Sequence, residues 1–494
     1  MQNGTPLAAI DLGSNSFRLE IGRYHSGHIE RIEYLKETVR QGSGLDENKV
    51  LNQAAMQRGW DCLARFAERL HGFKKHQVRA VATQTLREAR NRDEFLRKAQ
   101  SILGFQIEVI SGHEEARLIY QGVSRLLPQS DERRLVVDIG GRSTEMILGH
   151  GYESREMESY RLGSVAWTGR YFAKGQISAT AFRTAEVAAK AEIDQALDVF
   201  PPSEWSLAYG SSGTVSSVAD ILSANGWASG VVTRSGLDWL VERMIKAGHV
   251  DQLRVEGLKD ERRPVLCGGV SVLRAIFDLF GIEQMIPTQG ALRHGALYDL
   301  IDRETDGTDV RERTVRWLGE RFSIDGGQAD RVSRVATALF AQIAADDPLA
   351  GRYSQKLAWA AHLHEIGTHI SHDRSYHHGA YILDNVDAPG FSLAELHRMS
   401  QLVLGQRGKL KKMEDALTDE LFAKQLMSLR LAVLLCHARQ MPEYELLKLG
   451  YKPGTFRLST APGWAKRFPQ SAWLLGEEVQ AWQKTPWKLQ ADIR

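Results

Sequence analysis

The stretch that decides the fold occurs twice, as Asp11-Leu12-Gly13-Ser14-Asn15-Ser16 and as Asp138-Ile139-Gly140-Gly141-Arg142-Ser143. Each copy follows an apolar run and leads into a second strand-like run that ends in glycine, at Gly22 and at Gly149. This pattern predicts a hairpin whose turn presents backbone N–H groups to an anion such as phosphate. An aspartate repels a bare phosphate, so its presence indicates a metal ion or a metal-bound water between them. Two copies indicate a duplicated domain with a phosphate cleft between the halves.

Composition indicates a soluble globular protein of several domains. The chain has 494 residues, of which 43% are hydrophobic and 25% charged, and its formal net charge is +2. A balanced total says little about partners, because it can hide a basic groove. Its cysteines, Cys62, Cys267 and Cys436, are too few and too far apart for a disulfide scaffold or a thiolate metal site. No signal peptide or membrane span is visible, so we expect a cytoplasmic protein.

Strand and helix patterns alternate along the first three hundred or so residues. The spacing of apolar residues predicts a helix over 52–70, and a strand over 78–82 follows it. The second half repeats this logic, with a hairpin over 135–149 and a helix near 178–198. Such alternation predicts mixed sheets covered by helices.

The character of the chain changes after residue 302. The polar, charged segment 303–309 is the best linker candidate, and 310–440 then reads as almost wholly helical. The last stretch resembles a small mixed appendix. We therefore expect four parts, at 1–125, 126–303, 310–445 and 446–494.

Two adjacent glutamates begin a predicted helix after Ser111. Ser111 and Glu114 have the spacing of a capping box, which explains Glu114 as a structural residue. Glu115 points roughly 100° further around the helix axis and is not explained in this way. It is either a favourable partner of the helix dipole or a general base for a water nucleophile.

Two further helix starts are candidate anion sites. Arg87 lies in a first turn after a strand, where its guanidinium is either a bidentate phosphate ligand or a solvated side chain. The run Ser212-Gly213-Thr214 separates a strand from a helix, a position typical both of an anion site and of an ordinary cap.

The helical region carries a histidine cluster and a basic run. A zinc-protease interpretation fails, because His364 and His369 lie five residues apart and do not share a helix face. A histidine–aspartate phosphohydrolase is the other interpretation, but two of its metal-ligand positions have changed. Glu365 and Val433 stand where aspartates are expected. The run 407–412 is either a solvated face or a contact for a polyanion. The clustered histidines are His362, His364, His369, His372, His377 and His378.

These motifs, taken in order, resemble the Ppx/GppA phosphatases, which comprise exopolyphosphatases and guanosine pentaphosphate phosphohydrolases. The ordered set covers essentially the whole chain and is far more specific than any single motif. The matching segments are 9–17, 85–87, 110–119, 137–141, 210–214, 290–293, 364–367, 380–383 and 389–391.

The resemblance implies an α/β fold of two ribonuclease-H-like domains of the actin-like ATPase superfamily. An all-α histidine–aspartate-like domain and a small C-terminal α+β appendix would follow. It implies hydrolysis of terminal phosphoanhydride bonds with Mg²⁺, with Glu115 as the catalytic carboxylate. The metal would be held by Asp138 and Glu145, with Asp11 a weaker candidate. The implied phosphate-binding residues are Ser14, Asn15, Ser16, Arg87, Gly140, Gly141, Arg142, Ser143, Thr144, Ser212, Gly213 and Thr214.

The two copies of the turn differ in a way that matters for the chemistry. Only the second continues to a carboxylate, Glu145, where the first has Arg18. We therefore expect the first copy to grip phosphate and the second to organise the metal. Arg142 stands where the family usually has glycine or alanine, and its side chain either crowds the turn or strengthens phosphate binding.

From the sequence we place exopolyphosphatase activity first, because the helical region is closer in detail to those enzymes. Conversion of guanosine pentaphosphate to tetraphosphate is the alternative, since both substrates share their reactive end. A kinase or ATP-driven binding protein, and a non-catalytic guanosine tetraphosphate sensor, are the remaining hypotheses. The resemblance also implies a homodimer, and no membrane or nucleic-acid partner is expected.

Overall fold

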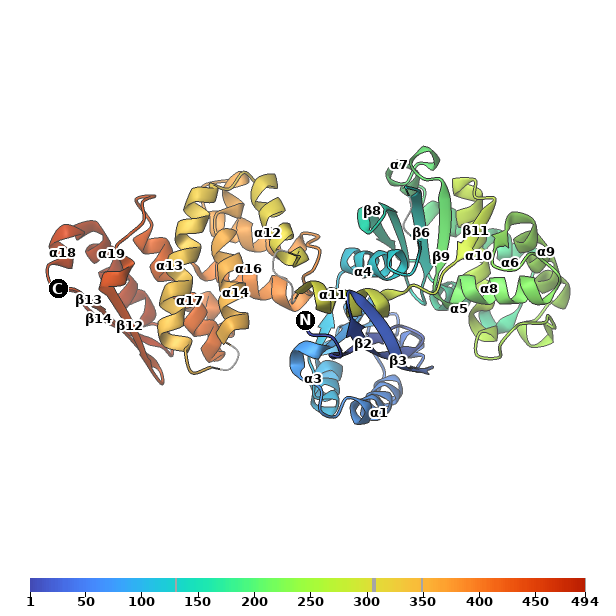
Figure 1. The fold of residues 1–494 in the computed structure, drawn as a ribbon, viewed down its shortest axis with the longest axis horizontal. Coiled ribbons are helices and arrows are strands. Elements are labelled where there is room, and N and C mark those ends of the chain that lie inside the picture. The colour runs from blue at the N-terminus through green and yellow to red at the C-terminus, as the bar shows by residue number, and fades with distance from the viewer. Residues whose placement is uncertain (129–130, 304–307, 348–349, 494) are drawn as a thin grey trace. The chain divides into compact units, whose positions relative to one another are not determined.

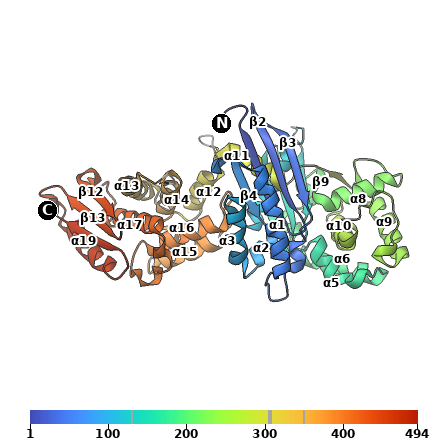
Figure 2. The same cartoon turned by 90° about the horizontal axis from the view of Figure 1, so that it is seen from below.

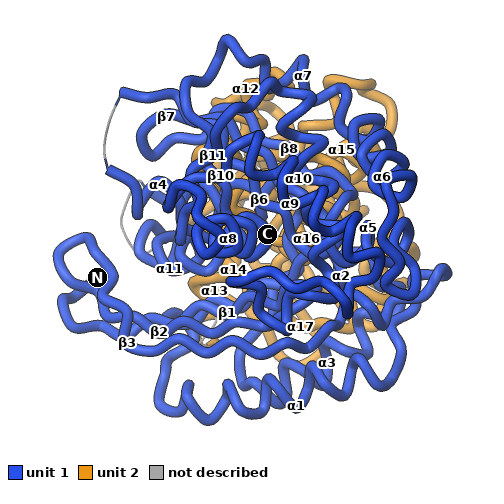
Figure 3. The backbone as a smooth tube through the Cα atoms, turned by 90° about the vertical axis from the view of Figure 1, so that its right-hand side faces the viewer, with its two compact units in different colours: residues 1–309 blue, residues 310–494 orange. Residues whose placement is uncertain are grey.

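The computed structural model describes residues 1–128, 131–303, 308–347 and 350–493. The chain forms two compact units, Met1–Asp309 and Val310–Arg494 (Figure 3). The linker expected at 303–309 lies largely outside the described residues. The finer division into four parts stays a prediction.

The first sheet joins three antiparallel strands to two parallel ones. Its strands are β1 (Pro6–Leu12), β2 (Phe17–His25), β3 (His28–Glu37), β4 (Val78–Ala82) and β5 (Ile107–Val109). Their order is β3-β2-β1-β4-β5, with β1 antiparallel to β2 and parallel to β4. Figure 2 labels β2, β3 and β4 of this sheet. The predicted strand over 78–82 is confirmed.

The second sheet repeats the plan of the first. Its strands are β6 (Arg133–Ile139), β7 (Thr144–His150), β8 (Glu153–Tyr160), β9 (Leu207–Ser211), β10 (Val232–Thr233) and β11 (Gln284–Pro287). Apart from β10 at one edge, the strands lie in the order β8-β7-β6-β9-β11. This order corresponds to β3-β2-β1-β4-β5 of the first sheet, with the same connectivity along the chain and the same strand directions. Even the β-bulge recurs, at Ile21/Gly22 and at Leu148/Gly149. The predicted duplication of an α/β domain is confirmed.

Helices cover both sheets (Figure 1). Those of the first half are α1 (Gln53–Arg69), α2 (Gln84–Glu88), α3 (Arg92–Leu103) and α4 (Gly112–Ser124). Those of the second half are α5 (Ser164–Tyr171), α6 (Ala179–Glu192), α7 (Ala196–Val199), α8 (Ser212–Ala224), α9 (Arg234–Ala247), α10 (Leu266–Phe280) and α11 (Leu292–Arg303). The helix expected over 52–70 is confirmed as α1, which Asn52 caps by accepting the Ala55 N–H.

The last helix of each half packs against the sheet of the other half. Helix α4 contacts β7 and β8, and Ile119 joins Val136 and Ile147 in one buried cluster. Helix α11 contacts β1, β2 and β4, and Leu297 joins Leu7 in another. The two halves therefore exchange helices.

The exchanged helices α4 and α11 touch through their backbones. A Cβ atom at Gly122 would lie 2.2 Å from the Ala291 carbonyl oxygen, and one at Gly295 would lie 1.8 Å from that of Leu118. Real Cβ atoms do not approach backbone atoms this closely, so a side chain at either glycine would push the helices apart.

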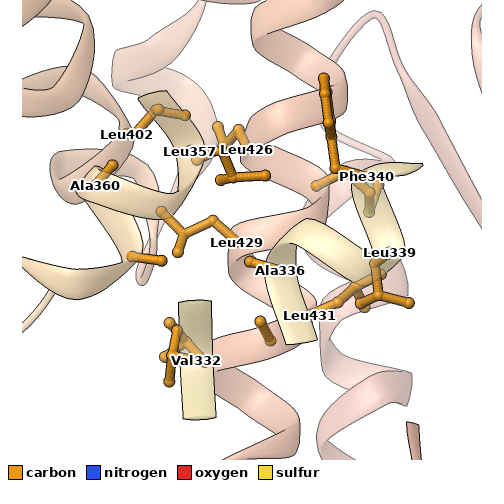
Figure 4. Close-up of a cluster of buried hydrophobic side chains, with 14 of the residues drawn as sticks. Val332, Ala336, Leu339, Phe340, Leu357, Ala360, Leu402, Leu426, Leu429 and Leu431 are labelled. Carbon is orange, nitrogen blue, oxygen red and sulfur yellow. The ribbon is translucent and has the colours of Figure 1, made fainter. Parts of the chain in front are cut away.

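The second unit is helical up to residue 446, and its described residues contain no strand before β12. Its main helices are α12 (Val310–Arg321), α13 (Gly326–Ala344), α14 (Ala350–His362), α15 (Ser375–Asn385), α16 (Leu393–Gly405) and α17 (Glu420–Leu435). Figure 4 shows part of its core, to which Leu339 of α13, Leu357 of α14 and Leu426 of α17 all belong.

A three-stranded sheet follows in the same unit. Its strands, in spatial order, are β12 (Leu447–Lys452), β13 (Thr455–Thr460) and β14 (Lys488–Asp492), and α18 (Trp464–Arg467) and α19 (Pro469–Trp482) lie between the last two in sequence. The predicted likeness of the helical part to histidine–aspartate domains stays a prediction. No helix among the described residues has both the length and the apolar character that a membrane span needs. All three cysteines are buried and unpaired.

Candidate active site

A cavity of about 360 Å³ lies between the two halves of the first unit, where the hairpin turns meet. A Cβ atom at Gly141 in one turn would lie 3.1 Å from the Ser14 Cβ in the other. The structure thus brings together most of the predicted site residues. Those that line the cavity are Asp11, Ser14, Asn15, Ser16, Glu115, Asp138, Gly140, Gly141, Ser143, Glu145, Ser212 and Gly213.

In each turn, one carbonyl oxygen accepts a hydrogen bond from a backbone N–H outside that turn. The Gly42 N–H donates to the Ser14 carbonyl at 2.7 Å, and the Ser164 N–H donates to the Gly140 carbonyl at 2.9 Å. A turn that binds an anion must keep its partly negative oxygens away from that anion. The two turns meet this condition in equivalent ways.

The carboxylates of Asp138 and Glu145 lie on neighbouring strands of the second sheet. They are direct partners in the β6–β7 register, and the Ser159 hydroxyl donates to Glu145 at 2.8 Å. Burial raises the pKa of Asp138 to about 6. Burial, reinforced by the negative charges of Glu115 and Asp138, raises the pKa of Glu145 well above its ordinary value. This concentration of buried negative charge favours a cation.

Glu115 enters the cavity from the first turn of α4. Ser111 caps this helix, because its hydroxyl oxygen accepts the Glu114 N–H at 3.1 Å. The Arg87 guanidinium donates to the Glu115 carboxylate at 3.2 Å. Burial, with the charges of Asp11 and Asp138, raises the pKa of Glu115 to about 7 despite Arg87. A carboxylate with such a pKa is suited to accept a proton near neutral pH.

The capping-box interpretation of Glu114 is wrong in one respect. Its N–H is capped as expected, but its own carboxylate does not return to the helix start. Instead Glu114 is fully buried and accepts from Arg117 at 2.7 Å and from Arg79 at 3.1 Å. These partners are charged, so Glu114 belongs to a buried ionic network and is more than a cap.

This network joins helix α4 to α11. Asp299 of α11 accepts hydrogen bonds from both Arg79 and Arg117, and Arg303 forms an ion pair with Asp299 at 2.6 Å. The start of α4 is therefore tied to β4 on one side and to α11 on the other. Glu115, the next residue after Glu114, takes its position from this fixed helix turn.

Asp11 and Arg18 neutralise each other inside the cavity. They face one another across the β1–β2 pair, and the Arg18 guanidinium donates to the Asp11 carboxylate at 2.9 Å. Asp138 has no such direct arginine partner in the equivalent pair, where Glu145 stands. The expected division of labour between the two copies stays a prediction.

Four predicted phosphate ligands do not line the cavity. Arg87 is turned toward Glu115, and the hydroxyl of Thr144 donates to the Leu162 carbonyl. The hydroxyl of Thr214 donates to the Ile139 carbonyl.

Arg142, the fourth, neither crowds its turn nor reaches into the cavity. Its guanidinium crosses to the first half, where it pairs with Glu88 at 3.1 Å and donates to the Gly42 carbonyl at 3.3 Å. Arg142 therefore tethers the second turn to the segment that supports the first.

A double-mutant cycle on Arg142 and Glu88 tests this tether. We expect Arg142→Ala, Glu88→Ala and the double variant to lower the free energy of unfolding by similar amounts, with a coupling energy of about 1 kcal/mol. Chemical denaturation measures it. Additive effects would show that the two side chains do not act as a pair.

The cavity also has a set of cationic residues that the sequence analysis did not single out. Arg31 and Lys36 come from β3, and Arg262 comes from the loop before α10. Arg293, quoted above only as part of a motif, belongs to the same lining.

The Arg262 guanidinium packs directly against Gly213. A Cβ atom at Gly213 would lie 1.5 Å from this guanidinium, so a side chain there would displace Arg262. The preceding Ser212 has a left-handed φ of 80°, which is unfavourable for a non-glycine residue. Strain of this kind concentrates at ligand-binding turns.

The donor set fits a magnesium ion that shares its coordination with substrate. Among the described residues, no group of three or more histidine, cysteine, aspartate or glutamate side chains is arranged to hold a metal alone. Magnesium typically takes one or two carboxylates and completes its shell with water and phosphate oxygens. Asp138 and Glu145 supply that number of carboxylates.

The histidine cluster of the second unit has no such arrangement within the described residues. His364 is buried, and its Nδ1 lies 2.6 Å from the Ala361 carbonyl oxygen. Burial lowers the pKa of His364 to about 4. The ring is thus a neutral part of the core.

Comparison with known proteins gives a consistent result along the chain. The Ppx/GppA phosphatase family model matches residues 21–304, and the model for domain III of the Ppx/GppA phosphatases matches residues 310–479. A protein of Vibrio atlanticus (strain LGP32) named guanosine-5'-triphosphate,3'-diphosphate pyrophosphatase is 40% identical over 471 residues, which is 94% of each chain. A protein of the same name from Aeromonas hydrophila is 38% identical and covers 99% of each chain.

Solved structures show the same fold. The Aquifex aeolicus PPX-GPPA enzyme matches with a TM-score of 0.51 and 26% identity, over 60% of this chain and 99% of that one. An exopolyphosphatase from Cytophaga hutchinsonii matches with a TM-score of 0.55 and 21% identity, over 60% of this chain and 98% of that one. From its two family matches and its full-length relatives, the chain belongs to the Ppx/GppA phosphatase family.

Proposed function

We propose that this protein hydrolyses the terminal phosphoanhydride bond of guanosine-5'-triphosphate,3'-diphosphate, releasing orthophosphate and guanosine tetraphosphate. The observation that carries the proposal is Glu115, a buried carboxylate with a raised pKa beside two phosphate-type turns. The names of the full-length relatives support the nucleotide as substrate.

Each part of the cavity has a role in this reaction. The turns at Ser14 and Gly140 hold the terminal phosphate through backbone N–H groups. Glu115 orients a water molecule and takes its proton as the water oxygen bonds to phosphorus. The bond from phosphorus to the bridging oxygen breaks, and the remaining nucleotide leaves with that oxygen. Arg18 and Arg262 offset the negative charge of the phosphates.

Magnesium would be held by Asp138 and Glu145 together with phosphate oxygens. When bound, it supplies positive charge that stabilises the transferring phosphoryl group. Arg87 holds the Glu115 carboxylate at one oxygen and so keeps the other oriented.

Inorganic polyphosphate is the second candidate. The cationic lining of Arg31, Lys36, Arg262 and Arg293 suits any polyanion, and the reactive end of polyphosphate is the same. From the sequence alone polyphosphate stands first. The relatives' names reverse that order, and we place the nucleotide first.

Orthophosphate release from both substrates tests this order. With Mg²⁺ present we expect kcat/KM for the nucleotide to exceed that for long-chain polyphosphate at least tenfold. Chelation of the metal should abolish both activities, and added Mg²⁺ should restore them. A preference for polyphosphate would reverse our order, and an inactive protein that binds guanosine tetraphosphate tightly would be a sensor rather than a hydrolase.

A further inference from the structure

We propose that Tyr34 is the platform on which the guanine base of the substrate stacks, which makes it the residue that separates nucleotide from polyphosphate. This inference rests on the proposed nucleotide substrate. Tyr34 is the only aromatic residue among the described residues that line the cavity. Most of the remaining lining residues are polar or charged, and polyphosphate has no use for an aromatic face.

The sheet register places Tyr34 at a suitable reach from the reacting end. Asp11 of β1 pairs with Arg18 of β2, which pairs with Lys36 of β3, and Tyr34 lies two residues further along β3. Standard strand spacings then put the Cα atoms of Asp11 and Tyr34 roughly 12 Å apart. A nucleotide whose terminal phosphate lies at the turns can extend its base over such a span.

The Tyr34 ring is held by a cation and is partly exposed. The Arg293 guanidinium lies 4.8 Å from the ring centroid, and Glu20 holds that guanidinium through a 2.6 Å hydrogen bond. Tyr34 nevertheless keeps 38% of its surface exposed. A ring held by a cation and left partly exposed at a cavity is suited to stack on a base.

A polar side chain is available for the edge of the base. Gln289 shortly precedes Arg293 in sequence and also lines the cavity. Its amide offers both a donor and an acceptor, and guanine presents both types at its edges. Stacking on Tyr34 supplies affinity for a base, and Gln289 supplies a group that can distinguish one base from another.

Three variants test the platform. We expect Tyr34→Ala to raise KM for the nucleotide about tenfold, the usual effect of losing one stacked base, with little change in kcat. Its KM for polyphosphate should stay within twofold of the wild-type value. Tyr34→Phe should keep nucleotide affinity. Ile32→Ala is the matched control, because Ile32 is exposed on the same strand but does not line the cavity.

Calorimetric binding separates this inference from the proposed function. If the wild type fails to hydrolyse the nucleotide, the function is wrong, yet binding of guanosine tetraphosphate still reports on Tyr34. Inorganic triphosphate serves as the probe without a base. Loss of guanosine tetraphosphate affinity with unchanged triphosphate affinity in Tyr34→Ala supports the platform. Equal weakening of both ligands, or no weakening of either, overturns it.

Discussion

Glu115→Gln should lower kcat for phosphate release by two to four orders of magnitude, the usual contribution of a general base. The amide of glutamine has the same size as the carboxylate. Its oxygen can still accept a hydrogen bond from Arg87, although a weaker one. It cannot accept a proton from water. Substrate affinity, measured by calorimetry with the same variant, should change little, because the turns and the cationic lining are untouched.

The pH profile provides the control for this variant. With a pKa near 7, Glu115 is ionised and able to accept a proton only above that value. The kcat/KM of the wild type should therefore rise as the pH increases through about 7 and then level off. Glu115→Gln should lose this limb. Near-normal turnover, or a retained limb, would assign the base to another residue.

Glu114→Gln should instead act on stability. Burial alone would raise the pKa of Glu114, but Arg117 and Arg79 hold it below its ordinary value. Removing one partner from a buried ion pair costs about 3–5 kcal/mol. We expect a loss of this size in the free energy of unfolding at pH 7, measured by chemical denaturation. The exposed Glu68→Gln is the matched control and should stay within about 0.5 kcal/mol of wild type.

The sign of the pH dependence is also fixed. A depressed folded-state pKa gives stability that is present above the unfolded value of about 4.3 and is lost as the pH falls through the folded value. The difference in the free energy of unfolding between wild type and Glu114→Gln should therefore become smaller at acidic pH. An unchanged stability of Glu114→Gln at pH 7 would restore the simple capping role.

The fold was largely predictable because its decisive signals are local. The two acid–glycine turns and their flanking apolar runs lie within short windows, and strand or helix periodicity does not depend on distant residues. The duplication follows from comparing two such windows. The pairing of Asp138 with Glu145 on neighbouring strands follows from the hairpin alone.

The site was less predictable where it depends on residues far apart in sequence. Glu114 looks like a cap because Ser111 is nearby. Its partner Arg79, and Asp299 that also pairs with Arg79, are distant along the chain and come together only after folding. Arg262 has no local signal either, since its role depends on its approach to Gly213. Tertiary contacts, rather than local propensity, decide both positions.

The exchanged helices have a consequence for the handling of this protein. A cut after residue 125 would separate α4, in the N-terminal fragment, from the second sheet that it covers. It would equally separate α11, in the C-terminal fragment, from β1 of the first sheet. Each fragment would therefore expose a sheet face that is covered in the whole chain, although the two sheets share one plan. The two halves are therefore interlocked, and Gly122 and Gly295 bring the backbones of the exchanged helices into contact.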